Sequence, residues 1–249
     1  GLSEKLFRKA VALGTKRYEA GAAGLSMVER LQDSILDKLV RKKVSERFGG
    51  RLKAFVSGGA PLNYDIGVFF LALGVRLLQG YGQTETAPVV SANPPSRIKI
   101  DTVGPAFPGV DLRIADDGEI LIRGELTMQG YWNAPELTAE TLRDGWVHTG
   151  DIGLLDEDGY IKITDRKKDI IVNSGGDNVA PQRVEGALVF EAEINQAMVY
   201  GDKRPHLVAV LVPDDDFIRS WASENDREAD LSALADSEAF HERLREALE

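Results

Sequence analysis

Two apolar segments, each followed by a glycine-rich segment, constrain the fold of this chain more than any other feature. Residues 52–56 run into residues 57–60 (SGGA), and residues 75–79 run into residues 80–86 (GYGQTET). Between them, Pro61 suits the first turn of a helix. If the apolar segments pair as parallel strands through this crossover, both glycine segments lie at carboxyl ends of strands, where open α/β sheets bind ligands. The pattern therefore predicts one ligand-binding crevice.

The second glycine segment carries the side chains of a recognition loop. Its glycines permit a sharp turn and the close approach of a flat ligand. Tyr81, Thr84, Glu85 and Thr86 add an aromatic ring, hydroxyls and a carboxylate. The alternative is a simple turn whose threonines satisfy nearby backbone groups. The two segments match neither a P-loop, which needs a Gly-Lys-Ser/Thr ending, nor the spacing of a dinucleotide fingerprint.

Composition excludes several classes of protein. A chain of 249 residues can hold about two domains. Its net charge of -10 argues against nucleic-acid binding. The absence of cysteine excludes disulfides and cysteine zinc sites, and three widely separated histidines make a histidine metal cluster improbable. We expect a soluble cytoplasmic protein with no transmembrane segment, and a peripheral position at the inner membrane face is left open.

Periodicity predicts three structural parts. Helices are expected over residues 2–20 and 27–48, the second opened by a capping box of Ser26 and Glu29. Period-two patterns predict a hairpin and further strands, and a mixed region follows with paired strands and helices. We expect an α/β and β chain: the end of a large α/β domain with a parallel-sheet unit (1–101), a small curled β-barrel-like subdomain (102–164) and a small α+β C-terminal domain (165–249).

Five motifs occur in one order along most of the chain. They are SGGAP at 57–61, YGQTET at 81–86, Tyr131-Trp132, WVHTGD at 146–151, and DRKKDIIVNSGGDNVAP at 165–181. In this order they resemble the adenylate-forming ligases of the acyl-CoA synthetase superfamily, and most closely its long-chain fatty acyl-CoA synthetases. For His148, inside the fourth motif, we favour a structural role that braces the strand, since nothing beside it resembles a nucleophile or a ligand set.

The resemblance implies a nucleotide site. Tyr81 would offer stacking area to adenine, and Asp151 would accept hydrogen bonds from both ribose hydroxyls. Asp151 could at the same time cap the turn at residues 150–153. The nucleotide-binding residues implied by the resemblance are Gly58, Gly59, Ala60, Gln79, Gly80, Tyr81, Gly82, Thr84, Asp151, Ile163, Arg166 and Lys168.

The resemblance also implies catalytic residues. Thr84 would meet the α-phosphate, Glu85 would ligate Mg²⁺, and Arg166 would reach the ribose or phosphate. Lys168 would assist Arg166. The alternatives are a surface carboxylate at a turn for Glu85 and a solvated charged face for Lys168.

Two further roles follow from the last motif. Asp165 is similar to the hinge about which the C-terminal domain of such enzymes swings between two half-reactions. Gly176 matches the glycine that lines the pantetheine tunnel for coenzyme A, where a side chain would crowd a thin ligand.

The implied activity is ATP-dependent activation of a long-chain fatty acid to an acyl-adenylate and its transfer to coenzyme A, with Mg²⁺. Alternatives are an adenylating ligase for an aryl, medium-chain or amino acid, and a non-catalytic nucleotide-binding module. The sequence contains no segment that resembles the family's upstream phosphate loop or its distal catalytic lysine. We therefore expect a C-terminal fragment, inactive alone, and a homodimer through the absent N-terminal part is left open.

Overall fold

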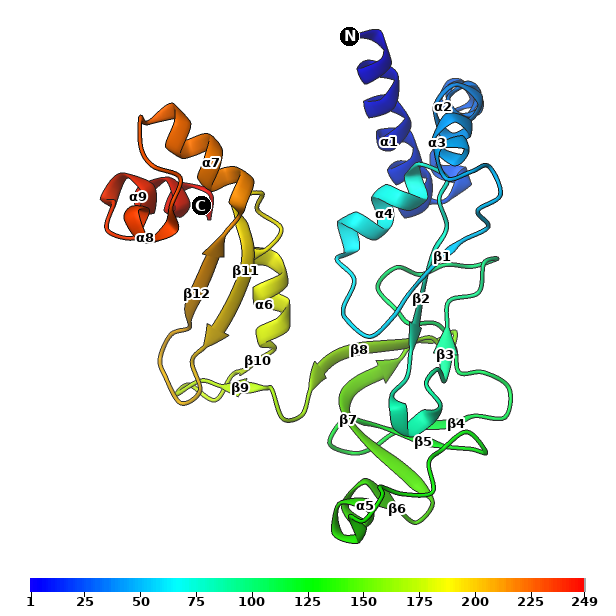
Figure 1. The fold of residues 1–249 in the computed structure, drawn as a ribbon. Coiled ribbons are helices and arrows are strands. Elements are labelled where there is room, and N and C mark those ends of the chain that lie inside the picture. Colours follow the sequence, from blue (N-terminus) through cyan, green and yellow to red (C-terminus); the bar gives the residue numbers. More distant parts are fainter. Residues whose placement is uncertain (249) are drawn as a thin grey trace. The chain divides into compact units, whose positions relative to one another are not determined.

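The computed structural model describes residues 1–248 and shows a mixed α/β chain with several sheets, as predicted (Figure 1). The chain divides into two compact units, Gly1–Thr164 and Asp165–Glu249. The further division of the first unit at residue 102 stays a prediction. Within residues 1–248, none of the helices has the length and apolar character needed to cross a membrane.

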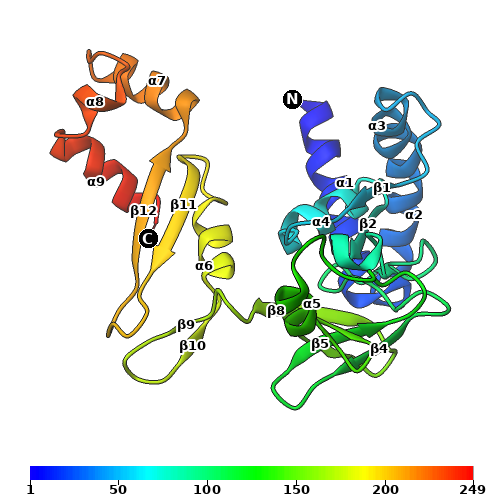
Figure 2. The same cartoon turned by 60° about the horizontal axis from the view of Figure 1, so that its bottom comes forward.

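The first unit begins with a layer of helices, which lies at one end of this unit in Figure 2. The capping box is confirmed, because Ser26 Oγ accepts from the Glu29 amide and the Glu29 carboxylate accepts from the Ser26 amide. One π-helical turn interrupts the second predicted helix. The elements are α1 (Leu2–Ala20), η1 (Ala22–Gly24), α2 (Met27–Leu36), η2 (Asp37–Arg41) and α3 (Lys42–Arg47).

Only one of the two apolar stripes on α2 and its continuation faces the core. Leu36 and Val40 are buried against α1, and Val44 packs beside them. Leu31 and Ile35, on the neighbouring stripe, stay 66% and 49% exposed. Periodicity alone shows both stripes, so the choice between them comes from tertiary packing.

A three-stranded sheet follows, and it confirms the predicted parallel crossover. β1 (Phe55–Ser57) pairs in parallel with β2 (Leu77–Tyr81), and β3 (Ser91–Ala92) is antiparallel to β2. The connecting helix, α4 (Tyr64–Ala72), starts later than predicted from Pro61, because Asn63 caps it by accepting from two backbone amides.

The predicted β subdomain is an open sheet of five strands and not a closed barrel. Its order is β4-β5-β7-β6, with β8 pairing with β7. The hairpin of β4 and β5 is confirmed. The sequence patterns did not predict the short helix α5. The elements are β4 (Asp111–Ile114), β5 (Glu119–Arg123), α5 (Pro135–Thr141), β6 (Leu142–Arg143), β7 (Trp146–Leu155) and β8 (Ile161–Arg166).

One apolar cluster joins the two sheets of the first unit. Tyr81 from β2 and Val90 pack with Ile120, Ile122 and Ile161 of β5 and β8, all of them buried. This shared core packs the end of β2 against β5 and β8, two of the strands that pair with β7. It thereby places residues 80–86 beside residues 146–151.

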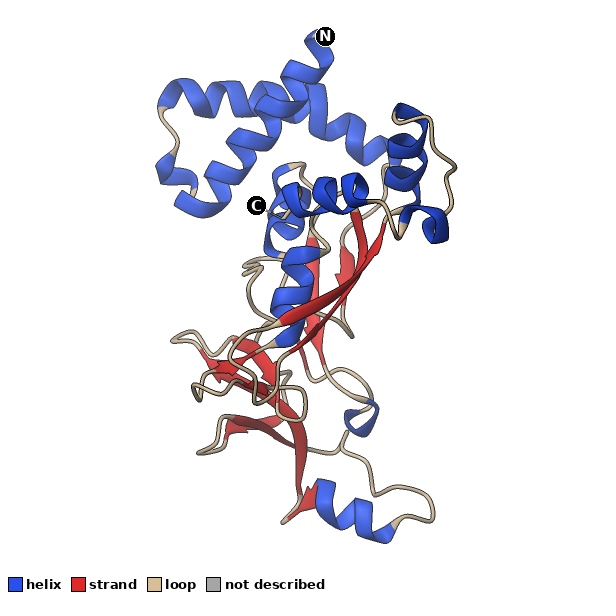
Figure 3. Ribbon diagram, turned by 90° about the vertical axis from the view of Figure 1, so that its left-hand side faces the viewer, coloured by secondary structure: helices blue, strands red, loops and turns tan. Residues whose placement is uncertain are grey.

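The second unit is a small α+β module in which two long antiparallel strands, β11 (Ile194–Tyr200) and β12 (Val208–Pro213), confirm the predicted pair (Figure 3). Helix α6 packs on β11, and an apolar cluster of Ile218, Trp221, Leu234 and Phe240 joins the last three helices. The other elements are β9 (Ile171–Val172), β10 (Asn178–Val179), α6 (Pro181–Leu188), α7 (Asp215–Glu224), α8 (Leu231–Leu234) and α9 (Glu238–Glu246).

Replacing Gly186 with alanine is expected to stabilise the second unit by about 0.5–1 kcal/mol, because glycine is a poor residue inside a helix. Gly186 lies in α6, and a Cβ there would meet nothing within 4 Å. The matched control is Gly176→Ala, where space is equally open but φ is +87°; it should destabilise by about 1 kcal/mol. Urea unfolding of both variants checks the opposite signs, and equal signs would contradict the argument.

Candidate functional site

The centre of the candidate site is a hydrogen-bonded group that joins the glycine segment to the WVHTGD motif. The Tyr81 hydroxyl donates to Asp151 Oδ2 over 2.6 Å, and Gln83 Nε2 donates to the same oxygen over 2.7 Å. Gln83 also donates to the Thr149 carbonyl over 2.9 Å. Tyr81 and Asp151 are 8% and 5% exposed. Two motifs separated by 70 positions in sequence therefore meet at one carboxylate.

Tyr81 is buried on its apolar side as well. Its ring belongs to the cluster with Val90, Ile120, Ile122 and Ile161. The predicted stacking of this ring on adenine stays a prediction.

Two hydrogen bonds hold Glu85 in place. The Tyr131 hydroxyl donates to Glu85 Oε1 over 2.6 Å, and the Met128 amide donates to the Glu85 carbonyl over 2.8 Å. Burial, followed by the hydrogen bond to Glu85, raises the pKa of the Tyr131 phenol above its usual value. The phenol therefore stays protonated at neutral pH and remains a donor to the carboxylate. Thr84, one residue before Glu85 in the short helix η3 (Thr84–Thr86), is exposed.

The glycines bring two backbone segments close together. Gly58, Gly59 and Ala60 form an exposed loop after β1. A Cβ on Gly58 would lie 3.1 Å from the Gly80 carbonyl oxygen, and one on Gly82 would lie 2.0 Å from the Pro88 carbonyl oxygen. Close packing of the protein backbone thus already requires a glycine at position 82.

Two residues that were predicted to contact the nucleotide make contacts within the protein. Gln79 is buried and its side-chain amide donates to the Ile100 carbonyl. Ile163 is partly buried and packs against the apolar cluster around Tyr81. Their contacts with a nucleotide remain predictions.

The remaining predicted residues lie in the second unit. Asp165 is its first residue; its Oδ1 is buried without a hydrogen-bond partner among residues 1–248, and burial raises the pKa of its carboxyl although Arg183 opposes the shift. Arg166 and Lys168 are exposed. Gly176 is exposed in a loop where Asn173 Oδ1 accepts from the Gly175 and Asp177 amides. The hinge, nucleotide and coenzyme A roles of these residues stay predictions.

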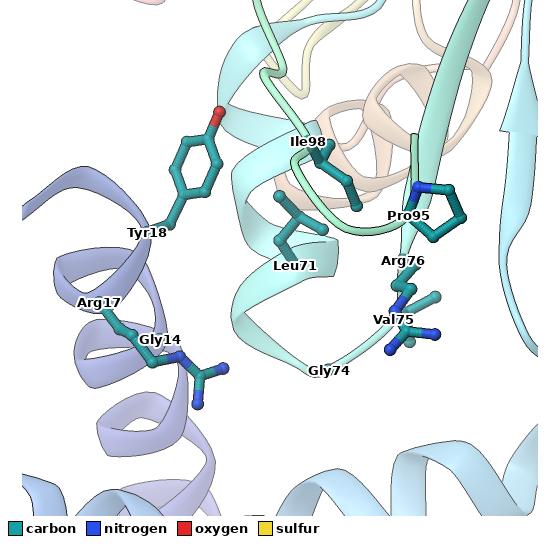
Figure 4. Close-up of a pocket in the computed structure, with 9 residues that line it drawn as sticks. All are labelled: Gly14, Arg17, Tyr18, Leu71, Gly74, Val75, Arg76, Pro95 and Ile98. Carbon is teal, nitrogen blue, oxygen red and sulfur yellow. The ribbon is translucent and has the colours of Figure 1, made fainter. Parts of the chain in front are cut away.

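A cavity of about 310 Å³ lies elsewhere in the first unit, between α1, α4 and the start of β2 (Figure 4). None of the predicted site residues lines it. The lining residues are Gly14, Arg17, Tyr18, Leu71, Gly74, Val75, Arg76, Pro95 and Ile98.

Three residues of the site had no predicted role. Gln83 stands inside the glycine segment and Tyr131 inside the Tyr-Trp motif, so their motif membership was the available signal. Thr149 lies in WVHTGD; its hydroxyl donates to the Ile120 carbonyl and accepts from the Asp151 amide. All three act on partners distant in sequence or on backbone, which motif reading does not reveal.

Residues of two of the motifs thus meet on an α/β scaffold, and comparison with known proteins gives the class of the chain. Residues 22–132 match the family model described as AMP-binding enzyme. The chain belongs to the adenylate-forming, AMP-binding enzymes, as the five motifs predicted.

Its relatives are long-chain acyl-CoA ligases. The chain is 42% identical over 214 residues to long-chain-fatty-acid--CoA ligase FadD15 of Mycobacterium tuberculosis, covering 86% of this chain and 35% of that protein. It is 35% identical over 249 residues to long chain acyl-CoA synthetase 3 of Arabidopsis thaliana, covering 94% of this chain and 37% of that protein. The chain thus spans little more than a third of the length of these relatives.

Solved structures give the same class. O-succinylbenzoate coenzyme A synthetase (MenE) from Bacillus subtilis, in complex with AMP, matches with a TM-score of 0.60 and 25% identity over 72% of this chain and 43% of that one. ATP-bound MatB from Rhodopseudomonas palustris matches with a TM-score of 0.59 and 30% identity, over 72% of this chain and 39% of that one.

Proposed function

We propose that this chain supplies the adenine- and ribose-binding part of an AMP-forming ligase that activates a long-chain fatty acid and passes it to coenzyme A. The observation that carries the proposal is the convergence of Tyr81 and Gln83 on the buried Asp151 carboxylate. An ionised carboxylate accepts several hydrogen bonds at once, so it can take the ribose hydroxyls of AMP in addition to protein donors.

The proposed reaction has two steps. The fatty carboxylate attacks the α-phosphorus of ATP, the bond from that phosphorus to pyrophosphate breaks, and an acyl-adenylate forms. The thiol of coenzyme A then attacks the acyl carbonyl, loses its proton and displaces AMP. The protein contributes mainly position and charge, with Thr84 and Arg166 as the proposed contacts to phosphate or ribose. Use of ATP fits the AMP-binding family and the ATP-bound MatB structure.

The residues fit Mg²⁺ as a cation held largely by substrate. Among residues 1–248 no three His, Asp or Glu side chains form a metal-binding group. Mg²⁺ usually takes one or two carboxylates together with substrate phosphates and water. Glu85 would supply that carboxylate, since Tyr131 uses only its Oε1. When bound, the ion would offset phosphate charge.

The proposed coenzyme A contact at Gly176 is supported by its backbone. Its φ of +87° and the open space at its Cβ position describe a loop that a thin ligand can approach. Lys168 and Arg166 would supply positive charge, and Asp165, the first residue of the second unit, is the proposed hinge.

Replacing Asp151 with alanine tests the nucleotide site. We expect AMP binding, measured by calorimetry, to weaken by about 10–100-fold, because the ribose loses hydrogen bonds to a charged acceptor. The matched control is Asp116→Ala, at an exposed position in the turn between β4 and β5, which should leave binding unchanged. Equal affinity of the Asp151 variant and the unsubstituted chain would exclude the ribose role.

The class of acid separates the main proposal from its alternatives. The relatives named above favour a long-chain acid, whereas MenE is named for the aryl acid o-succinylbenzoate. Non-hydrolysable acyl-adenylate analogues with long-chain, medium-chain, aryl and amino-acid groups should rank with the long chain tightest. Tighter binding of the aryl analogue would favour the alternative. Because this chain is expected to be inactive alone, it should show no robust acid-dependent ATP-pyrophosphate exchange, and robust turnover would contradict that expectation.

A further inference from the structure

The pairing of β5 with β7 is irregular next to the candidate site. Glu119 pairs with Ile152 and Leu121 pairs with His148, so two steps along β5 match four steps along β7. The additional residues of β7 bulge out, and Gly150 inside the bulge has a φ of +72°. Bulges of this kind redirect side chains and are frequent beside active sites. Here the bulge contains Asp151.

Side chains from both strands hold the backbone amides of the bulge. The Gly150 amide donates to Glu119 Oε1 over 2.8 Å, and the Asp151 amide donates to Thr149 Oγ1 over 3.1 Å. The Thr149 hydroxyl in turn donates to the Ile120 carbonyl over 2.7 Å. Buried backbone amides need such partners when the regular ladder is broken.

Glu119 holds the bulge and the residue before it with one carboxylate. Oε1 accepts from Gly150, and Oε2 lies 3.1 Å from His148 Nδ1. Glu119 is only 6% exposed. A carboxylate is rarely buried unless hydrogen bonds or charges compensate it, so its place beneath this bulge indicates a specific role.

We propose that Glu119 is a positioning residue, which holds the 149–151 bulge so that the Asp151 carboxylate faces Tyr81, Gln83 and the ribose of the nucleotide. The inference rests on the proposed function for its ligand. It assigns to Glu119 an effect on the ribose hydroxyls in particular, because Asp151 is the group that the bulge orients. A role in folding alone would weaken every nucleotide equally.

Calorimetry with AMP and with 2′,3′-dideoxy-AMP, which lacks both hydroxyls, tests the proposal. Glu119→Ala should weaken the binding of AMP about 10-fold, while the affinity for the dideoxy analogue should change about 2-fold or less. Glu119→Gln keeps an acceptor for the Gly150 amide and should stay within about 3-fold of the unsubstituted chain. The matched control is Glu125→Ala, at an exposed glutamate. Equal weakening of both nucleotides, or no weakening, would overturn the proposal.

A double substitution sharpens the result. If Glu119 acts through Asp151, Glu119→Ala should add about 2-fold or less to the loss caused by Asp151→Ala, because the effects of coupled residues are not additive. Full multiplication of the two losses would contradict the proposal. Thr149→Val provides a second route: it removes the acceptor of the Asp151 amide and should also reduce the preference for AMP over the dideoxy analogue.

Amide hydrogen exchange separates this inference from the proposed function. If the unsubstituted chain binds no AMP, the proposed function fails. Glu119 is then judged by the exchange of the Gly150 and Asp151 amides, which should accelerate at least about 10-fold in Glu119→Ala and not in Glu125→Ala. Unchanged exchange would overturn the positioning role. The same measurement across α1, which is not part of this sheet, reports whether the Ala variant is still folded.

Discussion

Replacing Arg41 with alanine is expected to lower the free energy of unfolding of the first unit by about 3–5 kcal/mol. The Arg41 guanidinium is 4% exposed and pairs with Asp33 Oδ1 over 2.6 Å. It also donates to the carbonyls of Ala72, Ala10 and Asp33 over 2.6, 3.1 and 3.3 Å. One side chain therefore ties together α1, α2 and the end of α4.

The size of this effect comes from what the substitution leaves behind. Asp33 is 8% exposed, so loss of Arg41 leaves a buried carboxylate and three carbonyl groups with fewer partners. Nothing in the helix pattern around residue 41 marks this arginine as a core residue. The buried ion pair, with its backbone contacts, is visible only once the helices are packed.

Arg17→Ala is the matched control, because Arg17 pairs with the other oxygen of Asp33 over 2.8 Å but is 39% exposed. We expect it to cost about 1 kcal/mol or less. Urea unfolding followed by circular dichroism measures both variants. Equal destabilisation by the two substitutions would show that burial and the carbonyl contacts of Arg41 do not set the effect.

Replacing Gly82 with alanine should both destabilise the first unit, by about 3 kcal/mol, and abolish measurable AMP binding. An added Cβ would lie 2.0 Å from the Pro88 carbonyl oxygen and 2.8 Å from the Val89 Cα. Both obstacles are backbone atoms, which cannot rotate away as a side chain can. The segment 82–89 would have to move, and Gln83 and Glu85 would move with it.

Gly109→Ala separates this clash from the general cost of replacing glycine. Gly109 has a φ of +83° and open space at its Cβ position, so alanine should cost about 1 kcal/mol through backbone strain and leave AMP binding unchanged. Urea unfolding and calorimetry provide the two readouts. Retention of AMP binding by Gly82→Ala would contradict the argument that this glycine sets the shape of the segment.

Much of the fold could be predicted because its signals are local. The capping box at Ser26 and Glu29, the parallel crossover and the β4–β5 hairpin each depend on residues close in sequence. The predicted β subdomain is an open five-stranded sheet, and its strand order depends on how distant strands meet, which no short pattern encodes. The predicted start of α4 at Pro61 was too early, because Asn63 caps the helix and α4 begins at Tyr64.

The candidate site was predicted in part. The motifs identified Tyr81, Glu85 and Asp151, but they gave no role to Gln83, Tyr131 or Glu119. The missing roles are hydrogen bonds between residues far apart in the chain, such as Tyr131 to Glu85 and Glu119 to Gly150. Such bonds depend on strand register and on the bulge in β7, which are properties of the assembled sheets.

The sequence by itself determined the class of protein and the order of its elements, because glycine spacing, caps and motif chemistry act within a few residues. Only the tertiary structure decided which helix stripe is buried, and that Arg41 and Glu119 are enclosed. It also decided that Tyr81 and Asp151 share a hydrogen bond. The physical reason is that burial and long-range pairing depend on residues that are distant in sequence. Local sequence patterns do not show which of these residues become neighbours in space.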